Sequence, residues 1–168
     1  MGSKQPKPAA VLVPIIERAH GLSILLTRRQ KNLNSHGGQI SFPGGKVERS
    51  DRSPLDTALR ETFEEIGISS DYINVLGYCD DYQTVTGYRI VPVVGFIRPG
   101  FELIADEGEV AEIFEVPFDF LMDGDNHRRD SILWQGKKRH YFAMPYEKHY
   151  IWGATAGILK NLHERLFD

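Results

Sequence analysis

The stretch "ALRETFEEIGI", residues 58–68, places three glutamates on one side of a predicted helix. With about 100° between successive residues, Glu61, Glu64 and Glu65 fall within one arc of about 100°. Like charges at this spacing destabilise a helix slightly, and acids near the C-terminal end oppose the helix dipole. Gly67 indicates the end of the helix. We therefore expect a cation to offset the charge of this acidic face.

The same helix has an apolar side that we expect to face the core, formed by Leu55, Leu59, Phe63 and Ile66. Its start is marked by Ser53, a good N-cap residue, and by Pro54, which suits the first helical position. These signals predict a helix over residues 53–66.

The remaining pattern predicts a mixed α/β protein whose sheet lies between helices. Residues 30–45 form a glycine-rich loop around a short extended piece. Strands are expected at 9–16 and 22–29 as a hairpin, then at 74–84, 88–97 and 109–117, with a helical turn at 118–122, a hairpin at 129–146 turning at 135–138, and a C-terminal helix at 151–167.

Length and composition limit the class of protein. The chain of 168 residues suits one domain, at residues 9–168, after a flexible segment 1–8 whose "MGS" resembles a cloning remnant. The net charge of −3 argues against duplex DNA or an anionic membrane as the main partner. The early apolar run at 9–16 is too short to span a bilayer. Cys79, the single cysteine, permits no intrachain disulfide, and we expect it to pack as a strand residue. We expect a cytoplasmic protein with a small-molecule partner, and the sequence leaves a homodimer open.

Two glycines precede the acidic helix, Gly44 and Gly45, and we expect them to end a strand and turn the backbone tightly toward a ligand. Because the acids lie at the far end of the helix, direct phosphate binding at its N-terminus is not the obvious arrangement. We expect the glutamates to hold Mg²⁺, with Mn²⁺ as an alternative, and a loop carbonyl, that of Gly45, to complete the site. The metal would then hold phosphate groups.

The segment "GKVERSDRSPLDTALRETFEEIGI", residues 45–68, resembles the Nudix box, G-x5-E-x7-R-E-U-x-E-E-x-G-U with U apolar. Asp51 replaces the first Glu, eight residues rather than seven separate it from Arg60, and Thr62 takes an apolar position. The matching positions are Gly45, Arg60, Glu61, Glu64, Glu65, Gly67 and Ile68. The resemblance implies a Nudix hydrolase with an α/β/α sandwich and a mixed sheet.

A second segment, "LLTRRQKNLNSHGGQISFPGG" at residues 25–45, resembles the signature of coenzyme A pyrophosphatases within that family. Gln30 replaces a small residue and Asn34 replaces an Arg. "IWGATAGIL" near the C-terminus is also typical of this branch. The matching positions are Leu25, Leu26, Thr27, Arg29, Gly38, Phe42, Pro43, Gly44 and Gly45.

The resemblance implies roles for individual residues. The three glutamates would bind metal, and Glu109 would add a ligand or act as base, with Glu112 as its rival. Arg60 would orient a box carboxylate by a bidentate ion pair. On the substrate side we expect the two glycines, Arg29 and His36. Arg28 and Arg29 are neighbours on a strand, so only one can face a phosphate, and the signature favours Arg29.

Three functions remain open. The first is Mg²⁺-dependent hydrolysis of coenzyme A or its thioesters to 3′,5′-ADP and 4′-phosphopantetheine. The second is the same chemistry on ADP-ribose or a dinucleotide, which the missing Arg at Asn34 keeps open. The third is a ligand sensor that does not hydrolyse, and the complete set of glutamates argues against it.

We interpret the run "KKRH", residues 137–140, as a solvated hairpin tip. We interpret four aromatic residues as core or rim residues rather than an adenine platform: Tyr82, Tyr88, Trp134 and Trp152.

Overall fold

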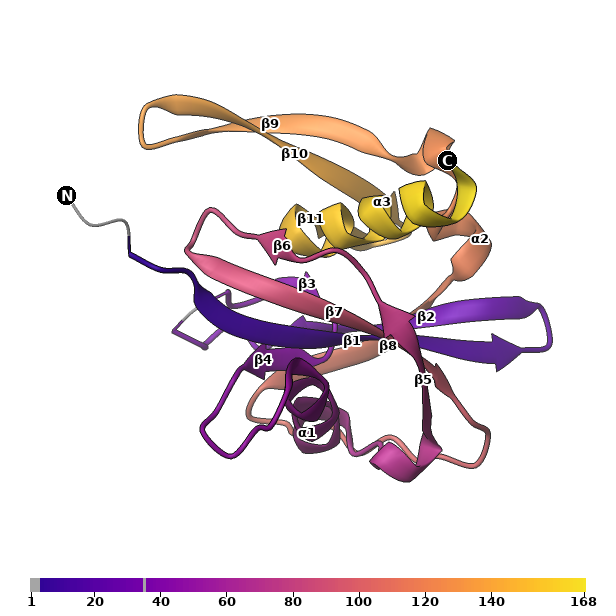
Figure 1. Ribbon diagram of the computed structural model, residues 1–168. Helices are drawn as coiled ribbons and strands as arrows, with labels where there is room; N and C mark the ends of the chain where they lie inside the picture. Colours follow the sequence, from indigo (N-terminus) through magenta and orange to yellow (C-terminus); the bar gives the residue numbers. More distant parts are fainter. Residues whose placement is uncertain (1–3, 35) are drawn as a thin grey trace.

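The computed structural model describes residues 4–34 and 36–168 (Figure 1). Its larger elements are β1 Lys7–Arg18, β2 Gly21–Arg29, β3 Ile40–Ser41, β4 Gly44–Lys46, α1 Pro54–Ile66, β5 Ile73–Tyr78, β6 Tyr82–Gln83, β7 Tyr88–Ile97, β8 Val110–Pro117, α2 Phe118–Leu121, β9 Arg128–Trp134, β10 Lys137–Tyr146, β11 His149–Trp152 and α3 Gly153–Phe167. Short 3₁₀ turns lie at Ser70–Tyr72 and Gly124–Asn126.

Most of these elements match the sequence prediction, with three differences. The predicted strand 74–84 is divided into β5 and β6, and the buried Cys79 lies just beyond the end of β5. The C-terminal helix begins at Gly153, because the two residues before it pair with β10 in β11. β1 begins at Lys7, within the segment expected to be flexible, because Lys7 already pairs with Tyr88 of β7.

The main sheet is mixed, as predicted. Its strand order is β3-β2-β1-β7-β5, with β4, β6 and β8 attached to β1, β7 and β2. β1 and β7 run parallel over ten residue pairs, from Lys7↔Tyr88 to Ile16↔Ile97, whereas the other pairings are antiparallel. β1 is apolar on both sides because it lies in the middle of the sheet and both of its faces are covered.

Helices cover both faces of this sheet (Figure 1). α1 packs on one face over Leu12 and Ile16 of β1, whereas Val13 of the same strand belongs to the core beneath α3. α3 lies between the main sheet and a second antiparallel sheet, β11-β10-β9, which the sequence did not predict as a separate layer. Among the described residues, no helix is long and apolar enough to cross a membrane.

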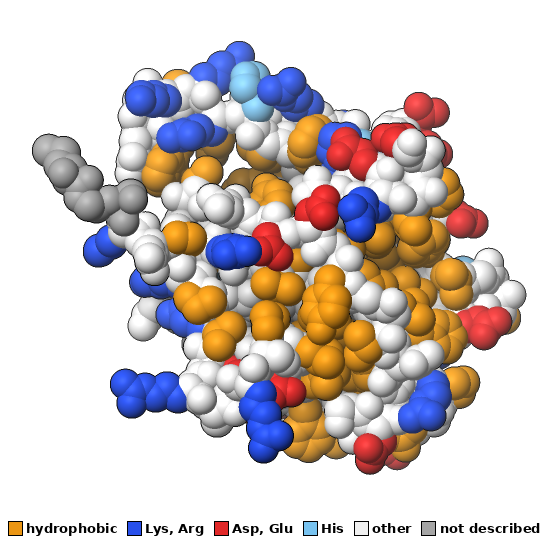
Figure 2. Space-filling view, viewed as in Figure 1, with side chains coloured by type: hydrophobic (Ala, Val, Ile, Leu, Met, Phe, Trp, Pro, Cys, Tyr) orange, Lys and Arg blue, Asp and Glu red, His pale blue; other side chains and the backbone are white. Residues whose placement is uncertain are grey.

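The hairpin of β9 and β10 extends from the body of the protein and carries many basic side chains (Figures 1 and 2). Its turn lies at Gln135–Gly136, so "KKRH" forms the exposed start of β10 rather than the tip itself. The guanidinium carbon of Arg139 lies 5.6 Å from the ring centre of Trp134.

α1 begins and ends as the sequence predicts. The Ser53 hydroxyl accepts a hydrogen bond from the Asp56 N–H at 3.3 Å, and the Asp56 carboxylate accepts one from the Arg52 N–H at 3.0 Å. Gly67 has a φ of 77° and donates its N–H to the Phe63 carbonyl at 3.0 Å. This left-handed end position favours glycine.

The predicted core face of α1 is confirmed for Ile66, which is buried, and for Leu55 and Leu59, which pack against the same core, but it is wrong for Phe63. Phe63 is 58% exposed, whereas Glu65 is only 4% exposed and lies on the face that packs toward the sheet. Small or satisfied side chains allow this close packing: Ala58 is fully buried, and the buried Thr62 hydroxyl donates to the Ala58 carbonyl at 2.7 Å. Thr62 therefore fits an apolar position because its own helix satisfies its hydroxyl.

Gly157 of α3 is required by a close approach to β6. A Cβ at this position would lie 2.6 Å from the Tyr82 hydroxyl oxygen and 2.7 Å from its ring carbon Cζ. We expect Gly157→Ala to lower the free energy of unfolding by about 1–3 kcal/mol, because overpacking outweighs the higher helix propensity of alanine. Urea unfolding measures this change.

The double variant tests the cause. In a Tyr82→Leu background the clash is absent, so adding Gly157→Ala should cost little or stabilise the helix. An equal loss of stability in both backgrounds would show that Tyr82 does not restrict position 157.

Candidate active site

Arg60 joins α1 to the loop before it. Its Nε and Nη2 donate to the two oxygens of Asp51 at 3.0 and 2.9 Å, a bidentate pair. Nη1 donates to Glu61 at 3.0 Å and to Glu64 at 3.3 Å, and Nη2 also donates to the Lys46 carbonyl at 3.1 Å. The guanidinium therefore fixes the loop and orients two of the box glutamates.

Asp51 stands where the box pattern has a glutamate, and its carboxylate is 4% exposed. Besides the Arg60 fork it accepts hydrogen bonds from the Glu48 N–H at 2.9 Å and the Thr57 hydroxyl at 2.8 Å. The hydrogen bonds from Arg60 hold the pKa of this carboxyl well below its usual range. The shorter side chain thus reaches the arginine despite the extra residue in the loop.

Glu65 is the buried acid of the site. Burial raises its pKa to about 8, and the nearby charges of Glu61 and Glu109 act in the same direction. Arg29 and a backbone hydrogen bond from Gly44 oppose this shift without cancelling it. Burial also raises the pKa of Glu61, against the effect of its arginine partner. When fully ionised, the cluster would therefore carry more negative charge than its protein surroundings offset, and it takes up protons instead.

Gly44 and Gly45, the glycines before α1, lie close to these acidic side chains. A Cβ on Gly45 would lie 2.6 Å from the Cδ and Oε1 atoms of Glu61. Both glycines belong to β4, where they pair with Ala10 and Val11 of β1. The expectation of a tight turn was wrong here: glycine is needed because the strand, the helix and the carboxylate approach too closely for a side chain.

Glu109 and Glu112 lie in different surroundings. The charge of Glu109 acts on Glu61 and Glu65, and its carbonyl accepts a hydrogen bond from the Gln30 N–H at 2.9 Å. The Gln30 side chain donates to the Glu107 carbonyl at 2.9 Å. Gln30, which replaces a small residue of the signature, therefore binds the segment that carries Glu109. Glu112 instead pairs with Arg28 on the other side of β2.

The donor set fits a divalent cation of the Mg²⁺ class, which prefers carboxylate and carbonyl oxygens. Glu61 and Glu65 would hold it, together with the 54% exposed Glu64 and the Gly45 carbonyl, and Glu109 lies beside them as a further ligand or as a base. Within residues 4–34 and 36–168, no three acidic, His or Cys side chains converge closely enough to form a ready-made cage. The Arg60 guanidinium already binds the carboxylates of Glu61 and Glu64 in this structure.

The predicted substrate residues occupy different places. The charge of Arg29 acts on Glu65, and its buried Nε has no hydrogen-bond partner in the described part of the chain. His36 is exposed in the loop with a φ of 56°, and its Nδ1 lies 3.1 Å from the Gln39 side-chain oxygen. The structure thus brings Arg29, but not His36, to the carboxylates.

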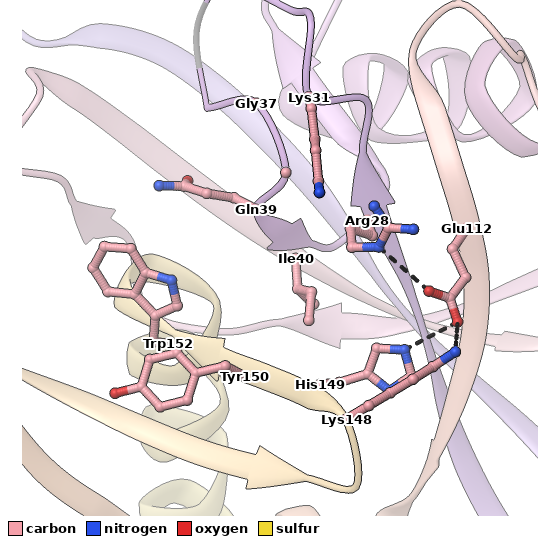
Figure 3. Close-up of a pocket in the computed structure, with 11 residues that line it drawn as sticks. Arg28, Lys31, Gly37, Gln39, Ile40, Glu112, Lys148, His149, Tyr150 and Trp152 are labelled. Carbon is pink, nitrogen blue, oxygen red and sulfur yellow. Dashed lines mark hydrogen bonds and ion pairs between the residues drawn. The ribbon is translucent and has the colours of Figure 1, made fainter.

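A cavity of about 650 Å³ opens on the Arg28 side of β2 (Figure 3). Sequence reasoning missed it, because its walls come from the signature loop and from β11, which are far apart in the chain. The alternation of Arg28 and Arg29 along β2 was the one available signal. Its lining residues are Arg28, Lys31, Gly37, Gly38, Gln39, Ile40, Glu112, Lys148, His149, Tyr150 and Trp152.

The chain belongs to the Nudix family: the NUDIX domain model matches residues 6–135. It is a Nudix pyrophosphohydrolase, with the mixed α/β fold of that family. A relative described as the uncharacterized Nudix hydrolase NudL, from Citrobacter koseri, is 41% identical over 157 residues, which cover 93% of this chain and 81% of that protein. The NudL of Escherichia coli K12 is 38% identical over 156 residues, with the same coverage.

Solved structures share the fold at lower identity. The NUDIX domain of Shewanella oneidensis NrtR, solved with ADP ribose, is 17% identical with a TM-score of 0.60, covering 98% of this chain and 90% of that one. A binary complex of a C. elegans Ap4A hydrolase is also 17% identical, with a TM-score of 0.57, covering 66% of this chain and 80% of that one.

The Arg60–Asp51 pair should contribute strongly to stability. Asp51→Asn leaves the guanidinium without its bidentate anion, and we expect the free energy of unfolding at pH 7 to fall by about 2–4 kcal/mol. Because the folded pKa of Asp51 is depressed, its contribution is present above the ordinary aspartate pKa of about 3.9 and is lost as the pH falls below it. Urea unfolding at pH 7 and at progressively lower pH should show the two proteins converging.

Asp81→Asn is the matched control, because Asp81 pairs with Arg89 on the exposed surface. Its loss should be below about 1 kcal/mol. Equal losses for the two variants would contradict a special role for the Asp51 pair.

Proposed function

We propose that this protein hydrolyses the pyrophosphate bond of coenzyme A and its thioesters, with Mg²⁺ or Mn²⁺ as the metal, to 3′,5′-ADP and 4′-phosphopantetheine. The observation that carries the proposal is the buried carboxylate of Glu65, crowded by Glu61 and Glu109 and facing Arg29. Such an arrangement destabilises the empty fold, so it is best explained by a ligand that brings positive charge and a second one that brings phosphate.

The reaction forms a bond between a water oxygen and one phosphorus and breaks the bridging P–O bond. The bound cation would neutralise phosphate charge and lower the pKa of its water. Arg60 is a positioning residue in this scheme, because it touches Glu61 and Glu64 rather than substrate. The unpartnered Nε of Arg29 would donate to a pyrophosphate oxygen, and Glu109 would accept the proton of the attacking water.

The preference for coenzyme A rests on the signature at residues 25–45. This segment supplies the second half of β2, the loop after it, β3 and part of β4, so it contributes Arg29, Gly44 and Gly45 to the site. The alternative, ADP-ribose or a dinucleotide, is favoured by Asn34, which lies exposed in that loop where the signature has an Arg. The NrtR domain solved with ADP ribose shares only the fold.

A substrate panel tests the proposal directly. Purified protein with Mg²⁺ is assayed on coenzyme A, acetyl-coenzyme A, ADP-ribose, dinucleotides and nucleoside triphosphates, and products are separated by chromatography. Coenzyme A or its thioester should give the highest kcat/KM, and chelation should abolish turnover. A higher kcat/KM for ADP-ribose or a dinucleotide would replace the proposed substrate by the alternative.

Glu65→Gln separates the metal chemistry from folding. The variant keeps the size of the side chain but removes a buried anion, so turnover should fall by roughly 10²-fold or more. The metal-free variant should be at least as stable as the wild type at pH 7, because a carboxyl with a raised pKa must take up a proton on folding and a glutamine need not. Activity assays and thermal unfolding measure both effects. Wild-type turnover in Glu65→Gln would place the metal elsewhere.

Arg29→Ala should impair coenzyme A and its 3′-dephospho form to the same extent, because Arg29 lies against the carboxylates that serve the pyrophosphate. We expect about a 10-fold to 100-fold loss in kcat/KM for both, as for a charged contact to phosphate. A loss confined to coenzyme A would instead mean that Arg29 contacts the 3′-phosphate.

A further inference from the structure

The cavity on the Arg28 side of β2 carries an excess of positive charge. Arg28, Lys31 and Lys148 line it, and Glu112 is the one acid among the described residues of the lining. Glu112 is already occupied: it pairs with Arg28 at 3.3 Å, with His149 at 3.0 Å and with Lys148 at 3.7 Å. In the described part of the chain, Lys31 forms no ion pair. The cavity therefore favours an anion.

Aromatic side chains form the opposite wall. Tyr150 and Trp152 of β11 lie next to each other and face the loop that carries Gly37 and Gln39 (Figure 3). Their ring centres are 6.5 Å apart, and the Trp152 ring also packs edge-on against Tyr141 at 5.1 Å. These contacts hold the indole in place as a surface on which a flat base can stack.

His149, at the start of β11, is held rigidly beside these aromatic residues. It is buried, its ring stacks on Phe114 with 3.7 Å between ring centres and 4° between planes, and its Nε2 contacts Glu112. Arg28 is held by the same carboxylate. Arg28 is thus fixed by a close ion pair. The exposed Lys31 forms no ion pair in the described part of the chain, and the 76% exposed Lys148 contacts Glu112 only at 3.7 Å, so both lysines can reach a ligand.

We propose that this cavity binds a nucleoside carrying a phosphate monoester, with the base on Trp152 and the phosphate at Lys31 and Lys148. If the proposed function holds, this ligand is the 3′-phosphoadenosine end of coenzyme A, and the cavity is what distinguishes coenzyme A from its dephospho form. The volume of about 650 Å³ suits a nucleotide. Arg28 and Arg29 are consecutive in β2, so the cavity and the carboxylate site lie at the same end of this strand.

Direct binding tests the cavity without hydrolysis. The probes are adenosine 3′,5′-bisphosphate and adenosine 5′-monophosphate, titrated calorimetrically into the full chain without metal. Lys31→Gln/Lys148→Gln should weaken the bisphosphate by about 10-fold or more and the monophosphate by much less. Trp152→Leu should weaken both probes. The matched control is Lys138→Gln, an exposed lysine of β10 outside the lining, which should change neither.

The outcomes separate this proposal from the proposed function. Both lysines are exposed, so thermal unfolding of the double variant should match that of the wild type. If the wild type hydrolyses coenzyme A but the double variant retains its affinity for the bisphosphate and its KM for coenzyme A, the cavity proposal is overturned and the function stands. If the wild type leaves coenzyme A intact yet binds the bisphosphate through the two lysines, the cavity is supported and the function is overturned. Absence of bisphosphate binding to the wild type overturns the cavity proposal.

Discussion

The ion pair between Arg60 and Asp51 is the interaction on which the arrangement of the site depends. A guanidinium offers five donors in one plane, and here one plane serves Asp51, Glu61, Glu64 and a backbone carbonyl. These hydrogen bonds fix the loop that carries Asp51, strand β4 and helix α1 relative to one another. Lysine at this position would keep the charge but lose the fork, so only an arginine can join the three segments in this way.

A second constraint follows from the buried glutamate of α1. A helix that packs a carboxylate toward a sheet must bring that carboxylate close to donors or to other charges, because an isolated buried anion is strongly unfavourable. The glycines of β4 allow the close approach, Ala58 and Thr62 keep the helix near the sheet, and Arg29 supplies positive charge from β2. The buried Glu65 therefore lowers the stability of the fold, as is common for residues of an active site.

Much of this molecule could be predicted from the sequence, and the failures have physical causes. The limits of α1 followed from Ser53 and Gly67, because capping is a local interaction. The mixed sheet was predicted through the resemblance of residues 45–68 to the Nudix box. The positions of two α1 residues did not follow, because hydrophobicity alone places Phe63 inside and Glu65 outside. The cavity could not be predicted either, since it joins Lys31 to Lys148 through the pairing of distant strands.

The two sides of β2 also have different origins along the chain. The carboxylate side is built entirely from residues within 6–135, the segment that defines the family. Lys148, Tyr150 and Trp152 on the other side come after this segment, from the added sheet against which α3 packs. Substitutions in that sheet can reshape one wall of the cavity while every carboxylate and the arginine fork remain in place. A change of ligand in the proposed cavity would therefore require no change in the carboxylate site.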